Sequence, residues 1–149
     1  MIGRFEVFTL ALSEMTYSWN KIATEELKPY GLKGTCIVYL IALYKIPEGL
    51  TAAKLCEMCS RDKAEVSRAI KSLEEKGFVV RKNTTVSSYR ANITLTDEGR
   101  KLTCELRERI KQLVEDGGKG LSDEQRDIFY DVLSKISTNL KLMADNKNK

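Results

Sequence analysis

The sequence has 149 residues, of which 42% are hydrophobic and 31% are charged, and its formal net charge is +4. This length fits one domain, and the apolar content excludes a chain that is disordered throughout. Between Ser60 and Arg90, eight Lys and Arg stand against four Asp and Glu, so this segment carries the whole net charge and indicates a polyanionic partner.

Residue types and spacing argue against a metal site, a disulfide framework and an enzyme. The chain has four cysteines and no histidine, and Cys56 and Cys59 form its single C-x-x-C pair. Because a structural zinc site needs four closely spaced Cys or His ligands, and there is no second pair, we expect free, buried thiols, no metal and no cofactor. No acid pair or nucleophile–base motif indicates a reaction. Apolar runs such as 37–43 are too short to span a membrane, which favours a cytoplasmic protein.

Residues 5–27 predict a helix with an apolar seam. Six apolar residues recur at spacings of 3, 4, 3, 4 and 3, namely Phe5, Phe8, Leu12, Met15, Trp19 and Ile22. This period is typical of a helix that packs along another helix. Two interpretations remain open, since the seam can pack on the domain's own core or against a second subunit.

The run 35–46, TCIVYLIALYKI, is apolar nearly all round and predicts a helix that is buried on most faces. A short β-strand is the alternative, but the length of the run and the absence of alternation favour a helix. Pro47 and Gly49 end this element, which we expect to be the central helix of the domain.

A helix-turn-helix is predicted over residues 51–76. Thr51 can accept a hydrogen bond from a free backbone N–H and so cap a short helix that runs to about Met58. A brief turn leads to Asp62, which is well placed at the positive N-terminus of a second helix over 63–76. Two short helices joined by a tight turn are typical of this motif.

The second helix presents two chemically different faces. At about 100° per residue, Val66, Ile70 and Leu73 fall within about 60° of one another and face the core. The opposite face is largely basic, and holds Arg61, Ala64, Arg68 and Lys71, flanked by Glu65 and Ser67. A solvated face is the simpler interpretation. We favour a recognition helix, because arginine and serine can bond base edges in the major groove while alanine permits close approach.

Residues 78–96 predict a β-hairpin that forms a wing. Gly77 suits a left-handed C-cap, and the runs 78–82 and 89–95 are rich in strand-forming residues. The loop 83–88 is rich in hydroxyls and suits phosphate contacts, although an ordinary exposed hairpin tip has the same composition. The candidate contacts of the wing are Arg81, Lys82, Thr84, Thr85, Ser87, Ser88 and Arg90.

Two more helices are predicted after the wing. Residues 96–98, Thr-Asp-Glu, open a helix that runs to about Glu115. Ser122 and Gln125 then form a capping-box pattern for a last helix, whose apolar seam consists of Phe129, Leu133, Ile136, Leu140 and Met143. Because seams of this kind lie at both ends of the chain, we expect a homodimer in which the terminal helices form a shared platform.

Three segments together resemble the MarR family of bacterial winged helix-turn-helix transcriptional regulators: DKAEVSRAIKSLEEKGFVVRK, ITLTDEGRKL and GLSDEQRDIFYDVLSKI, at 62–82, 93–102 and 120–136. The resemblance implies a mainly α fold with a small β-hairpin wing, in which one MarR-type domain occupies residues 1–145. Within it, residues 1–28 and 97–145 would be dimerisation helices, and residues 35–96 would be the winged helix DNA-binding lobe.

The family also implies a function. Its members are homodimers that bind a pseudo-palindromic operator in double-stranded DNA, often as repressors, and a small-molecule effector is expected between the terminal helices and the DNA-binding lobe. Tyr17, Trp19, Tyr30 and Tyr39 could line such a site. A winged-helix module for protein–protein contact, without DNA, is the alternative, and the local positive charge argues against it.

Carried over by position, the recognition-helix residues are Lys63, Ala64, Glu65, Ser67, Arg68 and Lys71, and Thr51 caps the preceding helix near a phosphate. The wing departs from the family pattern. Members usually carry Asp-x-Arg there, whereas this chain has Ser87 and Tyr89 at the two positions. Arg90, Arg81 or Lys82 would then supply the minor-groove contact.

Overall fold

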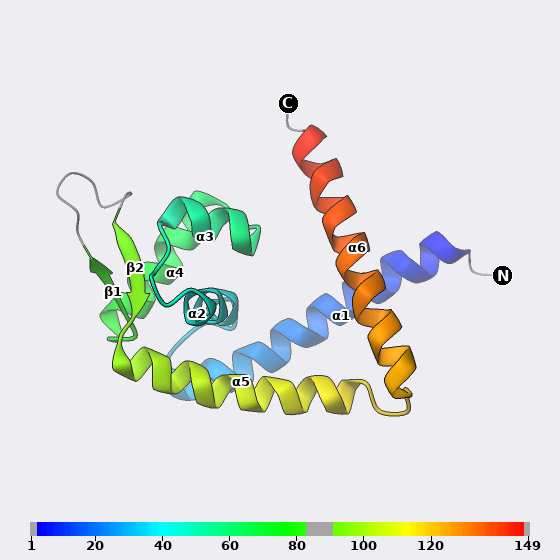
Figure 1. Cartoon of the computed structure of the whole chain (residues 1–149), viewed down its shortest axis with the longest axis horizontal. Helices are drawn as coiled ribbons and strands as arrows, with labels where there is room; N and C mark the ends of the chain where they lie inside the picture. The colour runs from blue at the N-terminus through cyan, green and yellow to red at the C-terminus, as the bar shows by residue number, and fades with distance from the viewer. Residues whose placement is uncertain (1–2, 83–90, 148–149) are drawn as a thin grey trace. The chain divides into compact units, whose positions relative to one another are not determined.

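The computed structural model describes residues 3–82 and 91–147, which form a mainly helical fold with one antiparallel pair of strands (Figure 1). The elements are α1 (Arg4–Leu27), η1 (Lys28–Tyr30), α2 (Cys36–Lys45), α3 (Ala52–Cys59), α4 (Lys63–Glu75), β1 (Val79–Lys82), β2 (Asn92–Leu95), α5 (Asp97–Gly117) and α6 (Asp123–Lys147). The chain divides into two compact units, Met1–Glu108 and Arg109–Lys149.

The first unit has α2 at its centre, as the apolar run predicted. Six residues of this helix are buried, namely Cys36, Ile37, Tyr39, Leu40, Ala42 and Leu43. Leu55 of α3, Val66 of α4 and Ile93 of β2 are also fully buried. Burial of this apolar surface is the main term that stabilises the unit.

The hairpin is antiparallel, with Val79 opposite Leu95 and Lys82 opposite Asn92. Strand β1 begins one residue after the start of the predicted run 78–82. Of the predicted run 89–95, residues 89 and 90 lie outside the described residues, and β2 begins at Asn92. At the start of the first run, Phe78 belongs to the helix end, because its N–H donates to the Leu73 carbonyl at 2.9 Å. That end is closed by Gly77, whose φ of 79° is the left-handed C-cap that the sequence predicted.

Helix α5 begins against the hairpin. Thr96 caps it by accepting a hydrogen bond from the Gly99 N–H at 3.0 Å, and its hydroxyl donates to the Gly77 carbonyl at 2.6 Å. Gly99 lies so close to the Phe78 carbonyl oxygen that an added Cβ would lie 1.9 Å from it. Only glycine fits this close approach of backbone to backbone.

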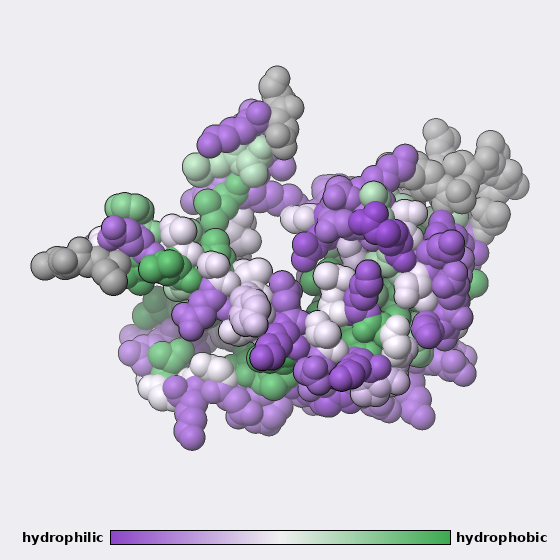
Figure 2. Space-filling model, turned by 180° about the vertical axis from the view of Figure 1, so that it is seen from behind, coloured by the Kyte–Doolittle hydropathy of each residue, from purple (hydrophilic) through white to green (hydrophobic). Residues whose placement is uncertain are grey.

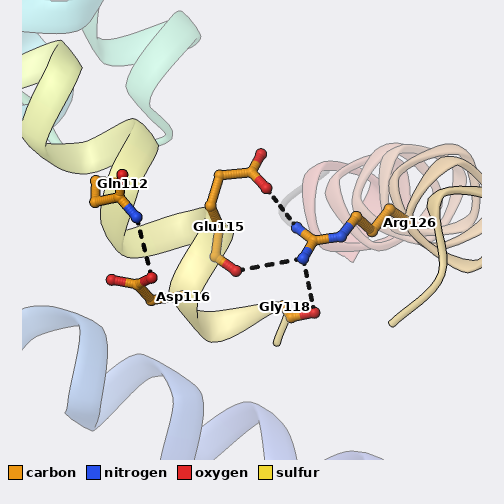
Figure 3. Close-up of polar contacts among 5 residues, drawn as sticks. All are labelled: Gln112, Glu115, Asp116, Gly118 and Arg126. Atoms are coloured by element: carbon orange, nitrogen blue, oxygen red, sulfur yellow. Dashed lines mark hydrogen bonds and ion pairs between the residues drawn. The ribbon is translucent and has the colours of Figure 1, made fainter. Parts of the chain in front are cut away.

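The second unit contains the end of α5, a glycine-rich turn and α6. Ser122 and Gln125 form the predicted capping box, with distances of 3.2 Å and 2.9 Å between each side-chain oxygen and the other residue's backbone nitrogen. Across the turn, the guanidinium of Arg126 bonds the Glu115 carboxylate and the Gly118 carbonyl (Figure 3). Among the described residues, no helix is long and apolar enough to cross a membrane.

Candidate nucleic-acid interface

The N-terminus of α4 is fixed by a capping box. The carboxylate of Asp62 accepts a hydrogen bond from the Glu65 N–H at 2.8 Å, and the Glu65 carboxylate accepts one from the Asp62 N–H at 3.2 Å. The backbone hydrogen bond from Glu65 holds the pKa of Asp62 below its ordinary value. The first turn of α4, which carries the predicted recognition residues, is therefore locally well defined.

The two faces of α4 lie as the helical placement predicted. Its inner face is buried and consists of Val66, Ala69, Ile70 and Leu73. The exposed side chains on its outer side are Lys63, Ala64, Ser67, Arg68 and Lys71. Arg68 and Lys71 have no hydrogen-bond or ion-pair partner in the described part of the chain, so both cations are available to an anionic ligand.

Two predicted contact residues have other local roles. Glu65 is only partly exposed and its carboxylate is engaged in the capping box. Placing Arg61 on the outer face of α4 was wrong, because this residue precedes the helix and is partly buried near Tyr39. Its Nε is buried without a hydrogen-bond partner among the described residues. Burial raises the pKa of Tyr39 to about 12, and the nearby guanidinium opposes this shift.

Helix α3 begins at the predicted cap. The Thr51 hydroxyl accepts a hydrogen bond from the Lys54 N–H at 3.2 Å, which is the geometry of an N-cap. The helix ends at Cys59, and Ser60 takes a left-handed conformation with a φ of 52°. This tight turn brings α4 directly after α3 and completes the helix-turn-helix.

The base of the wing lies beside α4. Arg81 of β1 forms an ion pair with Glu74 of α4, with 3.2 Å between Nε and Oε2. A hollow of about 230 Å³ lies between the helices and the hairpin. Its lining residues are Ala52, Lys63, Val66, Ser67, Ile70, Arg81 and Ile93. Lys82 is exposed at the end of the strand. The other predicted wing contacts lie outside the described residues, namely Thr84, Thr85, Ser87, Ser88 and Arg90.

Two contacts beside the interface were not predicted. The pattern Asp-x-x-Glu at Asp62 and Glu65 is a capping-box signature that the sequence did contain. The side-chain amide of Asn92 donates to the Glu48 carbonyl, which ties β2 to the segment before α3. Asparagine is depleted in strands. Its presence in the predicted strand was therefore the one sign in the sequence that this side chain has a specific hydrogen-bond partner.

The predicted dimerisation seams are exposed on both terminal helices. The α1 residues Phe5, Phe8, Leu12, Met15 and Trp19 are between 36% and 75% exposed. Those of α6, Phe129, Leu133, Ile136, Leu140 and Met143, are between 37% and 57% exposed. Apolar surface is visible along these helices in the space-filling view (Figure 2). The interpretation that the α1 seam packs on the domain's own core is therefore wrong.

The four aromatic residues predicted to line an effector site have different surroundings. Tyr39 is only 1% exposed, and Tyr30 packs edge-on against Phe78 with ring centroids 6.3 Å apart. Tyr17 lines an open hollow of about 440 Å³ on α1, whose other lining residues are Phe8, Thr9, Leu12, Ser13, Thr16 and Asn20. Tyr39 thus belongs to the core of the first unit, whereas Tyr30 is partly exposed.

The thiols are free but not all buried. Cys36 is buried, Cys59 is partly buried, and burial raises the pKa of both thiols. Cys104 is exposed, so the prediction that all four are buried was wrong for this residue. Within the described residues, no group of three or more Cys, Asp or Glu side chains is placed to hold a metal ion.

Known proteins with similar sequences support the helix-turn-helix described above. The model of the MarR family matches residues 30–86. An uncharacterised HTH-type transcriptional regulator of Bacillus subtilis (strain 168), YybA, is 26% identical over 122 residues, which cover 82% of this chain and 81% of YybA.

Solved structures of MarR family regulators have the same fold as this chain. A MarR transcriptional regulator from Methanosarcina mazei Go1 superposes with a TM-score of 0.81 at 22% identity, covering 92% of this chain and 99% of that one. A MarR family regulator from Listeria monocytogenes, complexed with a 26mer DNA, gives 0.81 at 21% identity, with 89% and 87% covered. Residues 30–86 thus match the MarR family model, and the chain has the winged helix-turn-helix fold of the solved MarR family regulators.

Proposed function

We propose that this protein is a MarR family transcriptional regulator, which binds a pseudo-palindromic operator in double-stranded DNA as a homodimer and represses the adjacent genes from the cytoplasm. The observation that carries the proposal is the face of α4 on which Arg68 and Lys71 are both exposed. An arginine on such a face can bond guanine through two hydrogen bonds in the major groove. The Listeria relative solved with a 26mer DNA supports this use of the fold.

Each part of the proposed DNA-binding lobe, residues 35–96, has a distinct role. Recognition falls to Lys63, Ala64, Glu65, Ser67, Arg68 and Lys71. The capped start of α3 at Thr51 faces a phosphate, since a helix N-terminus favours anions. Phosphate contacts of this kind fix the register of the protein on the duplex. The wing adds cations and hydroxyls from Arg81, Lys82, Thr84, Thr85, Ser87, Ser88 and Arg90.

Dimerisation is supported by the exposed seams of α1 and α6. Contiguous apolar surface of this kind is typical of a protein–protein interface. A two-fold dimer would present two copies of α4 to half-sites one helical turn apart. We therefore assign residues 1–28 and 97–145 to the dimer platform.

Release by a small-molecule effector is part of the proposal. The hollow of about 440 Å³ on α1 supports it, because hydroxyls of Thr9, Ser13 and Thr16 lie there beside Leu12 of the proposed seam, so that the effector would bind at the edge of the dimer interface. A bound effector should raise the melting temperature and weaken operator binding, and Thr16→Val should reduce both effects.

The decisive experiment is a binding titration with selected genomic fragments at several salt concentrations. Wild-type affinity should fall steeply with salt, since cations on the protein displace counterions from phosphates. Arg68→Ala should lower operator affinity by about 10-fold or more, the loss expected for one bidentate base contact. Lys119→Ala, which removes an equal charge from the turn before α6, should bind as wild type does. Absence of binding to any fragment at low salt would favour the protein–protein module instead.

A further inference from the structure

The segment between α2 and α3 is bound to strand β2 by three hydrogen bonds. Leu50 and Ile93 exchange backbone hydrogen bonds at 2.9 Å and 2.8 Å. The Asn92 side-chain amide donates to the carbonyl of Glu48. Residues 48–50 therefore lie alongside β2, on the edge of this strand that does not pair with β1.

Gly49 makes this close approach possible. Its φ is 97°, and an added Cβ would lie 2.7 Å from Cγ2 of Thr94 and closer still to the amide of Asn92. Only glycine combines this left-handed conformation with the available space. Gly49 thus lies close to the side chains of Asn92 and Thr94. The hydrogen bond from Asn92 holds the segment at Glu48, two residues before the backbone bridge at Leu50.

This segment determines where α3 begins. Leu50 is followed directly by Thr51, the N-cap of α3. On its other edge β2 pairs with β1, which carries Arg81 and Lys82. Strand β2 therefore lies between two features to which the proposed function assigns phosphate contacts, the N-terminus of α3 and the base of the wing.

We infer that Asn92 is a positioning residue for operator binding, which holds the N-terminus of α3 at a fixed distance from the wing. The inference rests on the proposed function and adds a residue that none of the predicted contacts included. Asn92 acts through Glu48 and Thr51, and it needs no contact with DNA. Asparagine is unfavourable in a strand, and here its side chain provides a donor that an apolar strand residue lacks.

The test uses Asn92→Leu, which keeps the approximate size of the side chain and removes the donor. Operator affinity of the full-length protein should fall by about 3- to 10-fold, the range expected for one hydrogen bond. The slope of affinity against salt should stay unchanged, because no cation is lost. Asn146→Leu, the same change near the exposed end of α6, should leave the affinity at the wild-type value.

A double-mutant cycle with Thr51→Ala separates positioning from a direct contact. If Asn92 acts through the start of α3, Asn92→Leu should cost less than about 2-fold in the Thr51→Ala background, because coupled residues are not additive. Fully additive losses would overturn the inference. Amide exchange supplies a readout without DNA: Gly49 and Leu50 should exchange faster in Asn92→Leu, while Val80, which lies opposite Thr94 in the β1–β2 pairing, should not.

The outcomes also separate this inference from the proposed function. A wild-type protein that binds no fragment overturns the proposed function and this role of Asn92 together. Wild-type binding with an unchanged Asn92→Leu affinity overturns the inference alone. If Asn92→Leu alters the far-ultraviolet circular dichroism, Asn92→Ala is the replacement variant and carries the same expectations.

Discussion

Arg126 of α6 donates from Nη1 to Oε2 of Glu115 at 2.7 Å, across the glycine-rich turn (Figure 3). Its Nη2 donates to the Gly118 carbonyl at 2.9 Å, and the Glu115 carbonyl also accepts from it at 3.4 Å. One guanidinium thereby joins the end of α5, the turn and the first turn of α6 within the second unit. The direction in which α6 leaves this turn depends on these contacts.

Arg126→Ala should therefore weaken the dimer. Loss of the hydrogen bonds to Glu115 and Gly118 should cost about 1 kcal/mol, which corresponds to about a fivefold rise in the dimer dissociation constant. Sedimentation equilibrium measures this constant. Lys135→Ala is the matched control, since it removes an exposed ion pair to Asp131 on the same helix and should change the constant by less than about twofold. Equal effects of the two variants would contradict a specific role of the Arg126 contacts.

The apolar seams should be required for dimerisation but not for folding of the first unit. Leu12→Asp or Ile136→Asp would place an unpaired charge in the proposed interface, and this should raise the dissociation constant by about 100-fold or more. Because both residues are exposed on the single chain, the circular dichroism spectrum should remain helical.

Ser134→Asp adds the same charge at an exposed polar position of α6, and this control should remain dimeric in analytical ultracentrifugation. Operator binding should fall together with dimerisation in the two seam variants. A monomeric variant that binds the operator as tightly as wild type would contradict the dimer model of recognition.

Local patterns predicted much of this fold. The period of apolar residues was sufficient for α1 and the two faces of α4, because helical faces depend on nearest neighbours along the chain. The length of the apolar run was sufficient for α2. Caps at Thr51 and Ser122 were predictable for the same reason, since each involves residues within one turn.

Contacts between distant residues were not predictable. Asn92 and Glu48 are 44 positions apart, and nothing in either sequence neighbourhood specifies the other. Burial of Arg61 near Tyr39 depends on how α2 packs on the turn before α4, which periodicity alone does not determine. The candidate interface was thus predicted best on α4, where its geometry is helical, and least well where loops and side chains from separate elements meet.

The capping box of α4 should give the stability of the protein a defined pH dependence. In the folded protein the pKa of Asp62 lies below its ordinary value of 3.8, because the Glu65 N–H stabilises the carboxylate. The charged form therefore adds stability above the ordinary pKa, and this contribution is lost as the pH falls from about 3.8 through the lowered value.

Asp62→Ala should accordingly destabilise the protein at pH 7 and have a smaller effect at pH 2.5, as measured by urea unfolding. Asp62→Asn is the control, because it keeps a capping acceptor without a titratable group. The stability difference between wild type and this variant should decrease over the same acid range. A difference that is constant from pH 7 to 2.5 would show that the charge of Asp62 does not contribute.

Two glycines of α5 should respond to alanine in opposite directions. At Gly99 an added Cβ would lie 1.9 Å from the Phe78 carbonyl oxygen, so Gly99→Ala must separate α5 from the hairpin and should cost about 3 kcal/mol or more. At Gly117 no atom lies within 4 Å of the added Cβ, and Gly117→Ala should stabilise the helix by up to about 1 kcal/mol. Thermal and urea unfolding of the two variants measure both effects against wild type. Both changes add one methyl group to the same helix, and they differ in whether that group meets the Phe78 carbonyl. A Gly99→Ala protein as stable as wild type would show that the start of α5 does not pack against Phe78.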